Sequence, residues 1–394
     1  MKLTSVLTAI KYVWQAKKIW AKPRVASVLI YDREGSVDFT DYLDFNNVEI
    51  FECRGESINI IVLLLSFYKF GLKINFERYA GQYLATVSPL VVLTFIDNTI
   101  TFYQLKKYFH KAKFISIQNG YRDNCLFKTL LEDSKKDELL EADAILCFGT
   151  AIGQEYTKHI TSEILPLGSF KNNKIHKNKK PKNISEILFI SQYRTPVWHN
   201  GNPTMPVGSR HILWDDFYST ESHLLPCLLS FCKANGYDLK VCGTSFNENR
   251  EEESYFISLL GEDGWSYIKK NSHLGSYERL DEAACVVFID STLGYEALGR
   301  GVKAIAFPAR GKALEADDRG FGWPANLSDT GPFWANNFDE SIVEGLLEYI
   351  TSVSDKDWQE TSQKIIPKIM GYDQGNIGFI HLLNDFGVSV KSSK

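Results

Sequence analysis

Short apolar runs alternate with helical stretches from Val25 onward, and this alternation restricts the fold more than any other feature of the chain. Strands that are buried on both faces appear in a sequence as continuous apolar runs, and helices between them connect parallel strands. The runs form two series, VASVLIY, VEIFEC, LVVLTFI, KFISI and AILCF, then EILFIS, DLKVCG, WSYIK, CVVFID and KAIAFP. The pattern predicts an α/β protein with two doubly wound parallel sheets.

A polar, lysine-rich stretch, KNNKIHKNKKPKN, separates the two series and shows neither strand nor helix periodicity. We therefore predict a first domain over residues 25–170, a linker over 171–183, and a second domain over 184–394 that includes the closing helices. Ligands of such proteins bind at the carboxyl ends of the strands. A cleft between the two domains is the expected site.

Composition excludes several classes of protein. The net charge of −4 gives no sign of nucleic-acid binding. The seven cysteines form no CxxC pair, and most lie inside apolar runs, which is typical of buried thiols in a reducing cytosol. No segment reaches the roughly 18 apolar residues of a membrane span, and no signal-peptide cleavage pattern is present. We expect a cytoplasmic protein.

Residues 1–24 carry a separate signal, because six Lys or Arg residues precede the first acid, Asp32. Apolar residues recur at helical spacing at Leu3, Val6, Leu7, Ile10, Val13 and Trp14. The segment is therefore predicted to be a basic amphipathic helix. Such a helix either packs on the body with its lysines in solvent or lies on a membrane surface as a peripheral contact.

The stretch FIDSTLGYEALGRG, from Phe288, places two hydroxyl residues between a strand and a helix. Ser291 and Thr292 fall at the predicted N-terminus of the helix, where free backbone N–H groups bind anions such as a nucleotide phosphate. Glu296 follows one turn later and is predicted to accept the hydroxyls of a ribose. The alternative is that Ser291 only caps the helix and Glu296 is a solvated side chain.

This arrangement in a two-domain α/β chain resembles the nucleotide-binding end of GT-B glycosyltransferases, which have two Rossmann-like domains. Longer blocks, including VCGTSFNENREEESYF, DDRGFGWPANLSDTGPFWANNFDE and IMGYDQGNIGFI, resemble bacterial surface carbohydrate biosynthesis proteins. Within that group the chain is most similar to the retaining β-Kdo transferase modules of lipopolysaccharide O-antigen synthesis, which use CMP-β-Kdo. Kdo is an eight-carbon acidic sugar. The chain departs from many CMP-sugar enzymes because none of its eight histidines precedes a proline.

The resemblance implies that the second domain holds a CMP-sugar donor and the first faces a glycan acceptor. Arg319, in ADDRGFGWP, is the predicted cation for the donor's phosphate or carboxylate. Its alternative is a surface ion pair with Asp317 or Asp318. Gln192, directly after the strand EILFIS, is also placed among the nucleotide-binding residues.

A retaining transfer by double displacement needs a carboxylate nucleophile and a second acid or base. The resemblance implies an Asp early in the second domain, where HILWDDFYSTESHLLP offers Asp215 and Asp216, and we choose Asp216. Both also fit a role in capping the following helix. In the first domain, FGTAIGQEY offers Glu155 as the second carboxylate, with a solvated side chain as its alternative.

The sequence holds no GxxxxGK[ST], HExxH or GxSxG motif, and its histidines are not spaced as metal ligands. We expect no required cofactor and no metal, with the CMP-sugar as a substrate. The prediction is a cytoplasmic retaining glycosyltransferase that transfers Kdo or a related acidic sugar to a surface glycan intermediate. The alternatives are a GT-B sugar-nucleotide epimerase and a non-catalytic glycan-assembly subunit.

Overall fold

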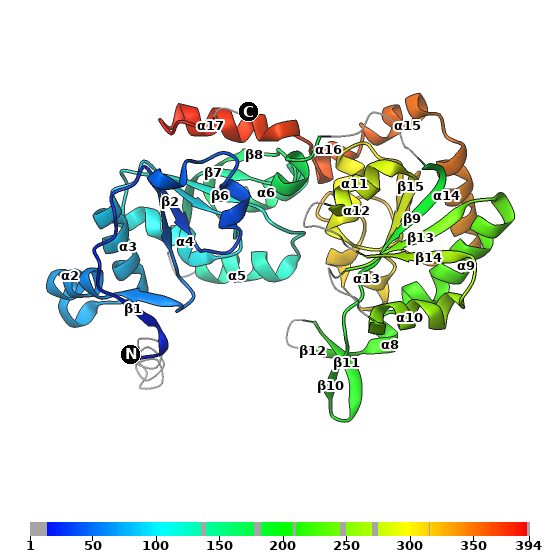
Figure 1. Ribbon diagram of the computed structural model, residues 1–394, viewed down its shortest axis with the longest axis horizontal. Coiled ribbons are helices and arrows are strands. Elements are labelled where there is room, and N and C mark those ends of the chain that lie inside the picture. Colours follow the sequence, from blue (N-terminus) through cyan, green and yellow to red (C-terminus); the bar gives the residue numbers. More distant parts are fainter. Residues whose placement is uncertain are drawn as a thin grey trace.

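The computed structural model describes residues 14–134, 139–176, 183–207, 210–244, 250–269, 275–314 and 316–391. The chain forms two α/β domains side by side along the long axis of the molecule (Figure 1). Each domain is built on its own sheet, and every apolar run named above contains all or part of a strand of one of these sheets. The predicted alternation of strands and helices is confirmed.

The first domain holds a fully parallel six-stranded sheet. Its strands in spatial order are β3 (Val48–Phe51), β2 (Val28–Tyr31), β5 (Val91–Thr94), β6 (Lys113–Ile117), β7 (Glu141–Leu146) and β8 (Thr161–Leu165). Side chains alternate between two apolar cores, so that Leu29 faces one core and Val28 and Ile30 face the other. Helices on both faces explain why these strands are continuous apolar runs.

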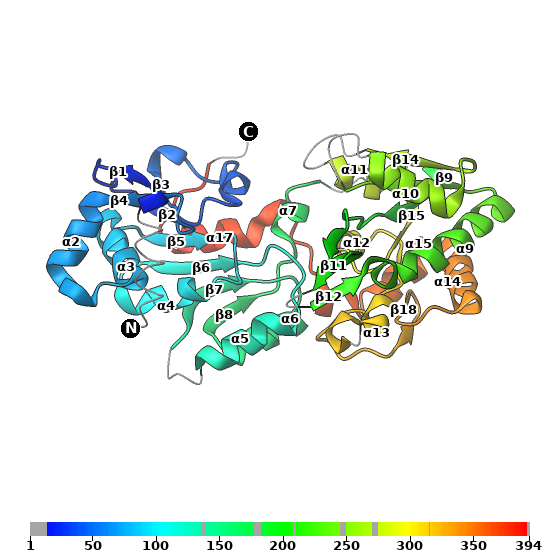
Figure 2. The same cartoon turned by 90° about the horizontal axis from the view of Figure 1, so that it is seen from below.

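The second domain holds a seven-stranded sheet that is parallel except at one edge. Its strands in spatial order are β14 (Trp265–Ile268), β13 (Asp238–Cys242), β9 (Asn183–Ile190), β15 (Ala283–Phe288), β16 (Ala304–Ala306), β18 (Trp334–Ala335) and β17 (Thr330–Gly331). The helices α9 (Ser219–Asn235) and α14 (Glu340–Ser352) pack together and against this sheet, and α11 (Gly275–Glu282) and α12 (Thr292–Gly299) form a second pair against it. Figure 2 shows the helices around this sheet.

The end of the chain differs from the predicted domain boundary. Helix α17 (Ile377–Asp385) was assigned to the second domain, but it lies over the first domain (Figure 1), where Phe379, Leu382 and Leu383 join the core of the first sheet. The chain crosses back at Tyr372, which forms a β-bridge with Gly168. Gly168 has φ 83°, and a Cβ there would lie 2.0 Å from the carbonyl oxygen of Gly371. The chain therefore passes between the domains twice, first before β9 and again at Tyr372. Burial of the apolar face of α17 in the first domain fixes this second crossing.

The predicted linker also begins as ordered structure. Helix α7 (Phe170–Asn173) occupies its start, and the side chains of Asn172 and Asn173 are buried between the two domains. Arg300 donates to the Asn172 carbonyl and amide oxygens at 3.2 Å, which fixes this crossing as well. Residues 177–182 of the predicted linker lie outside the described residues.

The N-terminal prediction of one helix over residues 1–24 is wrong after residue 15. Residues 14 and 15 are helical, but Lys17–Ile19 form strand β1, which pairs in parallel with β4 (Ser57–Asn59). The apolar positions at helical spacing end at Trp14, and the residues that follow pair with the edge of β4 instead. Residues 1–13 lie outside the described residues. Within the described chain, no helix is both long and apolar enough to cross a membrane.

A three-stranded antiparallel sheet projects from the second domain and was not predicted. It consists of β10 (Val197–His199), β11 (Asn202–Val207) and β12 (Arg210–Leu213), and it protrudes below the body in Figure 1. The short helix α8 (Trp214–Phe217) follows directly and packs against β11 and β12. Pro203 and Pro206 within β11 hid this strand from the sequence pattern.

Candidate active site

A cavity of about 1050 Å³ opens between the domains at the carboxyl ends of the strands. The first domain contributes Asp123 together with Asn124 and Lys128 of helix α5 (Asn124–Ser134). The second domain contributes the ends of β9 and β15, the base of the projecting sheet and the 3-10 turn at Asp317–Arg319. We call this cavity the cleft. Of the predicted nucleotide-binding residues, it brings together Gln192, Ser291, Thr292 and Arg319.

Ser291 and Thr292 stand at the N-terminus of α12, as predicted from the spacing of the motif. Ser291 is the N-cap residue, but its hydroxyl makes no capping hydrogen bond. The Thr292 hydroxyl accepts a hydrogen bond from the backbone N–H of Tyr121 at 3.4 Å. The helix end therefore presents a hydroxyl and the positive end of its dipole to the cleft, an arrangement that favours an anion.

A buried guanidinium lies beside this helix end and was missed from the sequence. Arg310 is 2% exposed, donates to Asp290 at 3.0 Å and to Glu221, and has its ζ-carbon 4.3 Å from the Phe217 ring centre. Its Nε has no partner among the described atoms. Nη1 of Arg319 lies 3.6 Å from the second carboxylate oxygen of Asp290. The two arginines therefore flank Asp290.

Basic side chains outnumber acidic ones in the described lining of the cleft, although Arg310 is itself paired with the carboxylates of Glu221 and Asp290. The described lining carries five basic side chains, Lys128, Arg194, Arg210, Arg310 and Arg319, against two acids, Asp123 and Asp318. Burial raises the pKa of Glu221 to about 7, and the nearby Arg310 lowers it in part. Because low-dielectric surroundings strengthen interactions with charge, this lining favours a ligand with more than one negative group.

The loop that brings the first domain to the cleft depends on Asp97, another residue that the sequence did not reveal. Asp97 is fully buried, accepts from the Asn119 backbone at 3.2 Å and from Arg122 Nε at 2.7 Å, and also accepts from the Tyr156 hydroxyl. The same loop reaches the second domain, where the Tyr121 ring stacks 4.9 Å from that of Tyr295. Asp97 thus fixes a loop that forms one wall of the site.

The predicted catalytic carboxylates are not gathered in the cleft. Asp215 and Asp216 lie on α8 with exposed side chains, although the next residue, Phe217, lines the cavity. Glu155 lies on α6 (Thr150–Thr157), where its carboxylate pairs with Lys158 at 2.5 Å. The sequence could not show which way these side chains point.

Glu296 has a setting that differs from the predicted ribose contact. Its carboxylate does not line the cleft and accepts hydrogen bonds from the Tyr277 hydroxyl at 3.1 Å and from Ser169. Burial raises its pKa to about 7, and the hydrogen bonds from Ser169 and Tyr277 lower it in part. Since Ser169 precedes α7, the carboxylate joins the two domains at their crossing point.

Replacing Glu296 by Gln is expected to flatten the dependence of stability on pH. The pKa is higher in the folded protein than its ordinary value of 4.5, so this group's contribution to stability is lost as pH rises toward and through 7. Glutamine keeps the acceptor oxygen but has no charge to bury, so the fall in unfolding free energy between about pH 5 and pH 8 should shrink by about 1–3 kcal/mol. Chemical denaturation at several pH values measures this, with the exposed Glu348→Gln as control. An unchanged pH profile would contradict the buried setting.

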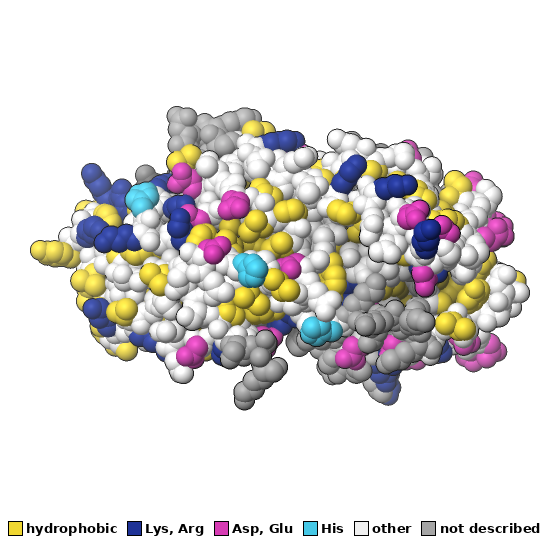
Figure 3. Space-filling view, turned by 90° about the horizontal axis from the view of Figure 1, so that it is seen from above, with side chains coloured by type: hydrophobic (Ala, Val, Ile, Leu, Met, Phe, Trp, Pro, Cys, Tyr) yellow, Lys and Arg dark blue, Asp and Glu magenta, His cyan; other side chains and the backbone are white. Residues whose placement is uncertain are grey.

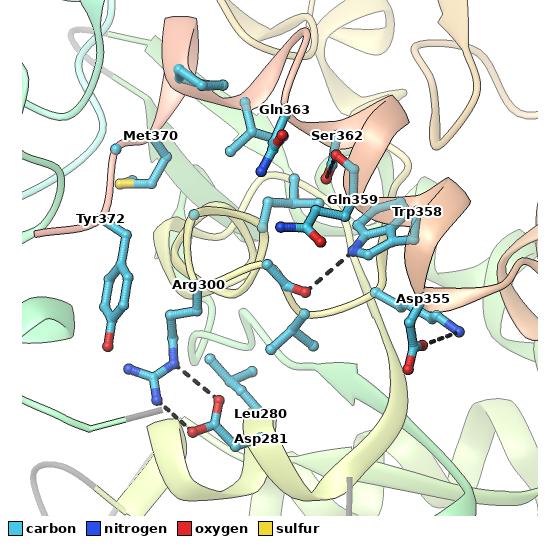
Figure 4. Close-up of a pocket in the computed structure, with 18 of the residues that line it drawn as sticks. Leu280, Asp281, Arg300, Asp355, Trp358, Gln359, Ser362, Gln363, Met370 and Tyr372 are labelled. Carbon is cyan, nitrogen blue, oxygen red and sulfur yellow. Dashed lines mark hydrogen bonds and ion pairs between the residues drawn. The ribbon is translucent and has the colours of Figure 1, made fainter. Parts of the chain in front are cut away.

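A second cavity, of about 570 Å³, lies at the opposite edge of the second sheet, where β15 and β16 begin (Figure 4). Its most buried polar group is Arg300, which is paired with Asp281 through Nε at 3.0 Å. Trp358 donates to the Gly301 carbonyl at 3.2 Å, and Lys303 pairs with Asp355 at 3.0 Å. These polar groups are engaged with one another, so the cleft is the better candidate for a ligand.

No group of three or more His, Cys, Asp or Glu side chains suited to a metal ion occurs within the described part of the chain. The oxygens best placed to meet a cation in the cleft are those of Asp123 and Asp318. Asp318 already accepts a hydrogen bond from the Asn124 backbone at 2.8 Å.

A family model described as "putative O-antigen biosynthesis protein" matches residues 115–386, which is more than half of the chain. The chain belongs to this family of O-antigen biosynthesis proteins. The match spans α5, the crossing between the domains and almost all of the second domain, and thus covers both walls of the cleft. Membership supports a role in surface carbohydrate biosynthesis. No curated protein gives a significant match to the chain.

Solved structures show the fold of this family member. A "putative UDP-N-acetylglucosamine 2-epimerase" from Listeria monocytogenes is 11% identical, with TM-score 0.52, over 92% of this chain and 97% of that chain. Another UDP-N-acetylglucosamine 2-epimerase is 12% identical, with TM-score 0.51 and the same coverage. A glycosyltransferase from Rickettsia africae is 12% identical, with TM-score 0.48, over 91% and 89%. The first two matches show the fold, which is GT-B, as predicted.

Proposed function

We propose that this protein is a glycosyltransferase that transfers Kdo or a related acidic sugar from a CMP donor to a surface glycan intermediate. The observation that carries the proposal is the basic cleft, in which Ser291, Thr292, Arg310 and Arg319 lie together at the end of β15. A single phosphate fits a helix N-terminus flanked by guanidinium groups. The family match supports a carbohydrate product, and the GT-B fold supports a nucleotide-sugar donor.

The charge of the cleft supports an acidic sugar. A CMP-linked sugar acid carries one phosphate and one carboxylate, which are two separate anions. Arg310 and Arg319 lie near the helix end, while Lys128 approaches from the first domain and Arg194 follows β9. We assign the donor's phosphate to Ser291, Thr292, Arg310 and Arg319. We assign the sugar carboxylate to Lys128 and Arg194.

The proposed reaction is a double displacement through Asp216. The carboxylate attacks the anomeric carbon and CMP leaves with the bonding electrons, which gives a covalent glycosyl-enzyme. An acceptor hydroxyl then attacks the same carbon while Glu155 takes its proton, Asp216 leaves, and the anomeric configuration is retained. In this structure Asp216 is exposed and Glu155 pairs with Lys158, and neither lines the cleft, so the proposal requires both carboxylates to turn toward it when donor and acceptor bind.

CMP is expected to raise the thermal unfolding midpoint more than UDP or GDP at equal concentration. A ligand that binds only the folded state stabilises it by mass action, so the ranking of the shifts reports the ranking of affinities. A thermal-shift panel of the three nucleotides and their sugars measures this directly. An equal or larger shift with UDP would remove the CMP assignment. Conversion of a UDP-sugar without any acceptor would instead identify an epimerase, and donor binding without turnover would identify a non-catalytic subunit.

We further propose that the acceptor is lipid-linked and that the enzyme works in the cytoplasm at the inner face of the membrane. Glycan intermediates of surface polysaccharides have to be elongated where their lipid carrier lies. A peripheral contact through the N-terminal segment would bring the first domain, which we propose faces the acceptor, to that surface. The segment's six basic residues before Asp32 support such a contact.

A further inference from the structure

Helix α2 (Ile60–Phe70) is apolar around its whole circumference, and Lys69 is its one charged residue. Its inner side packs against α3 (Phe76–Val87), with Val62 and Ser66 buried. A helix that is hydrophobic on all sides is normally covered on all sides. Here the outer side is uncovered and exposes Leu64, Leu65, Phe67 and Tyr68, the last at 91% exposure.

The apolar surface continues beyond α2. Leu72, in the 3-10 turn Gly71–Lys73, is also 91% exposed, and Phe76 follows at the start of α3. Trp20 is exposed directly after β1, and this segment is tied to the N-cap of α2 because Asn59 Nδ2 donates to the Ala21 carbonyl at 2.8 Å. We call this surface the α2 patch; its members are Trp20, Leu64, Leu65, Phe67, Tyr68, Leu72 and Phe76. It occupies the end of the first domain that lies farthest from the second (Figure 1).

Basic side chains surround the α2 patch. Residues 14–25 and 60–78 together contain seven Lys or Arg residues and one acid, Glu77. The exposed lysines Lys17, Lys18, Lys22, Lys69 and Lys73 are among them. Figure 3 shows dark blue basic and yellow hydrophobic side chains together at this end of the molecule, on the left of the view. Apolar area combined with cationic side chains is the chemistry that a surface of anionic lipid selects.

We infer that the α2 patch docks the protein onto an anionic lipid bilayer, with its aromatic and leucine side chains in the headgroup boundary and the lysines on the lipid phosphates. A second copy of the chain is a poorer occupant, because a symmetric contact would bring the two sets of lysines together. The inference extends the proposed function, since a lipid-linked acceptor lies in a membrane. Its test uses no donor, so either proposal can fail without the other.

The test is vesicle flotation of the full chain with phosphatidylglycerol–phosphatidylethanolamine vesicles and with phosphatidylcholine vesicles. We expect binding to the anionic vesicles that weakens as salt rises. The variant Leu64→Ser/Tyr68→Ser/Leu72→Ser should lose about tenfold or more in vesicle affinity with an unchanged thermal unfolding midpoint, because the changed side chains are exposed. The variant Lys69→Gln/Lys73→Gln should weaken binding to the anionic vesicles and leave binding to phosphatidylcholine vesicles unchanged.

The matched control changes three exposed apolar residues of the second domain. Ile184, Val197 and Trp198 are 78%, 48% and 71% exposed, and their replacement by Ser should leave vesicle binding unchanged. Absence of wild-type binding, or equal binding by the α2 patch variant, would overturn the inference. If the wild type sedimented as a dimer and the α2 patch variant as a monomer, the patch would be assigned to a second copy of the chain. If residues 1–13 occupied the α2 patch, the substitution Leu7→Ser/Ile10→Ser would free the patch and increase vesicle binding. That result would assign the patch to this segment of the chain.

Discussion

Replacing Arg310 by methionine is expected to lower the free energy of unfolding by about 3–5 kcal/mol at pH 8. The guanidinium holds two carboxylates inside the protein, those of Glu221 and Asp290, and Glu221 Oε2 already has no partner among the described atoms. Methionine fills a similar volume, so the loss comes from an uncompensated buried charge rather than from a cavity. Denaturant titration measures the difference.

The pH dependence of this loss separates charge from packing. Burial raises the pKa of Glu221 to about 7 even with Arg310 present, and removing the cation raises it further. Glu221 then takes up a proton as pH falls, so the deficit at about pH 5.5 should be smaller than at pH 8. Arg210→Met, at an exposed arginine of the same cleft, should cost less than about 1 kcal/mol. A variant as stable as the wild type at pH 8 would contradict the buried ion cluster.

The buried strands of the two sheets could be predicted because each is a run of consecutive apolar residues. CVVFID holds the second half of β15 and AILCF begins in the second half of β7, since strands covered on both faces need apolar side chains throughout. The same reasoning fails where the structure of a segment is determined by pairing or packing with a segment far away in the sequence. Residues 17–19 became a strand because β4 offers a free edge, and α17 joined the first domain because that sheet had an uncovered face.

The cleft was predictable where its residues stand in recognisable local patterns, and Gln192, Ser291, Thr292 and Arg319 all line it. Ser291 and Thr292 follow a strand and open a helix, which is a local pattern. Arg310, Lys128 and Asp97 come from separate elements, and each looks like an ordinary surface charge in the sequence. Their role follows from burial and from the neighbours that folding brings, which no local spacing records. For the same reason the spacing of Glu296 was read as a ribose contact although its carboxylate faces Ser169 and Tyr277.

Asp216→Asn is expected to abolish sugar transfer while leaving the CMP-induced rise in unfolding temperature unchanged. A double displacement forms a covalent bond to the nucleophile, and an amide of nearly the same shape cannot form it, so the loss falls on the transition state. The residue is exposed, and its carboxylate makes no hydrogen bond or ion pair within the described part of the chain, so the change should not disturb folding. Asp215→Asn, at the neighbouring exposed position, is the matched control and should keep transfer.

Trapping the intermediate locates the nucleophile directly. Incubation with a CMP-sugar donor and a poor acceptor should give a protein heavier by one sugar, with the adduct on the HILWDDFY peptide. An adduct on Asp123 or Asp318, the two acids that line the cleft, would keep the double displacement and move the nucleophile to the cavity wall. Inversion at the anomeric carbon would exclude double displacement altogether. Because Asp216 is exposed on α8, an adduct at this position would also show that its side chain turns into the cleft when donor binds.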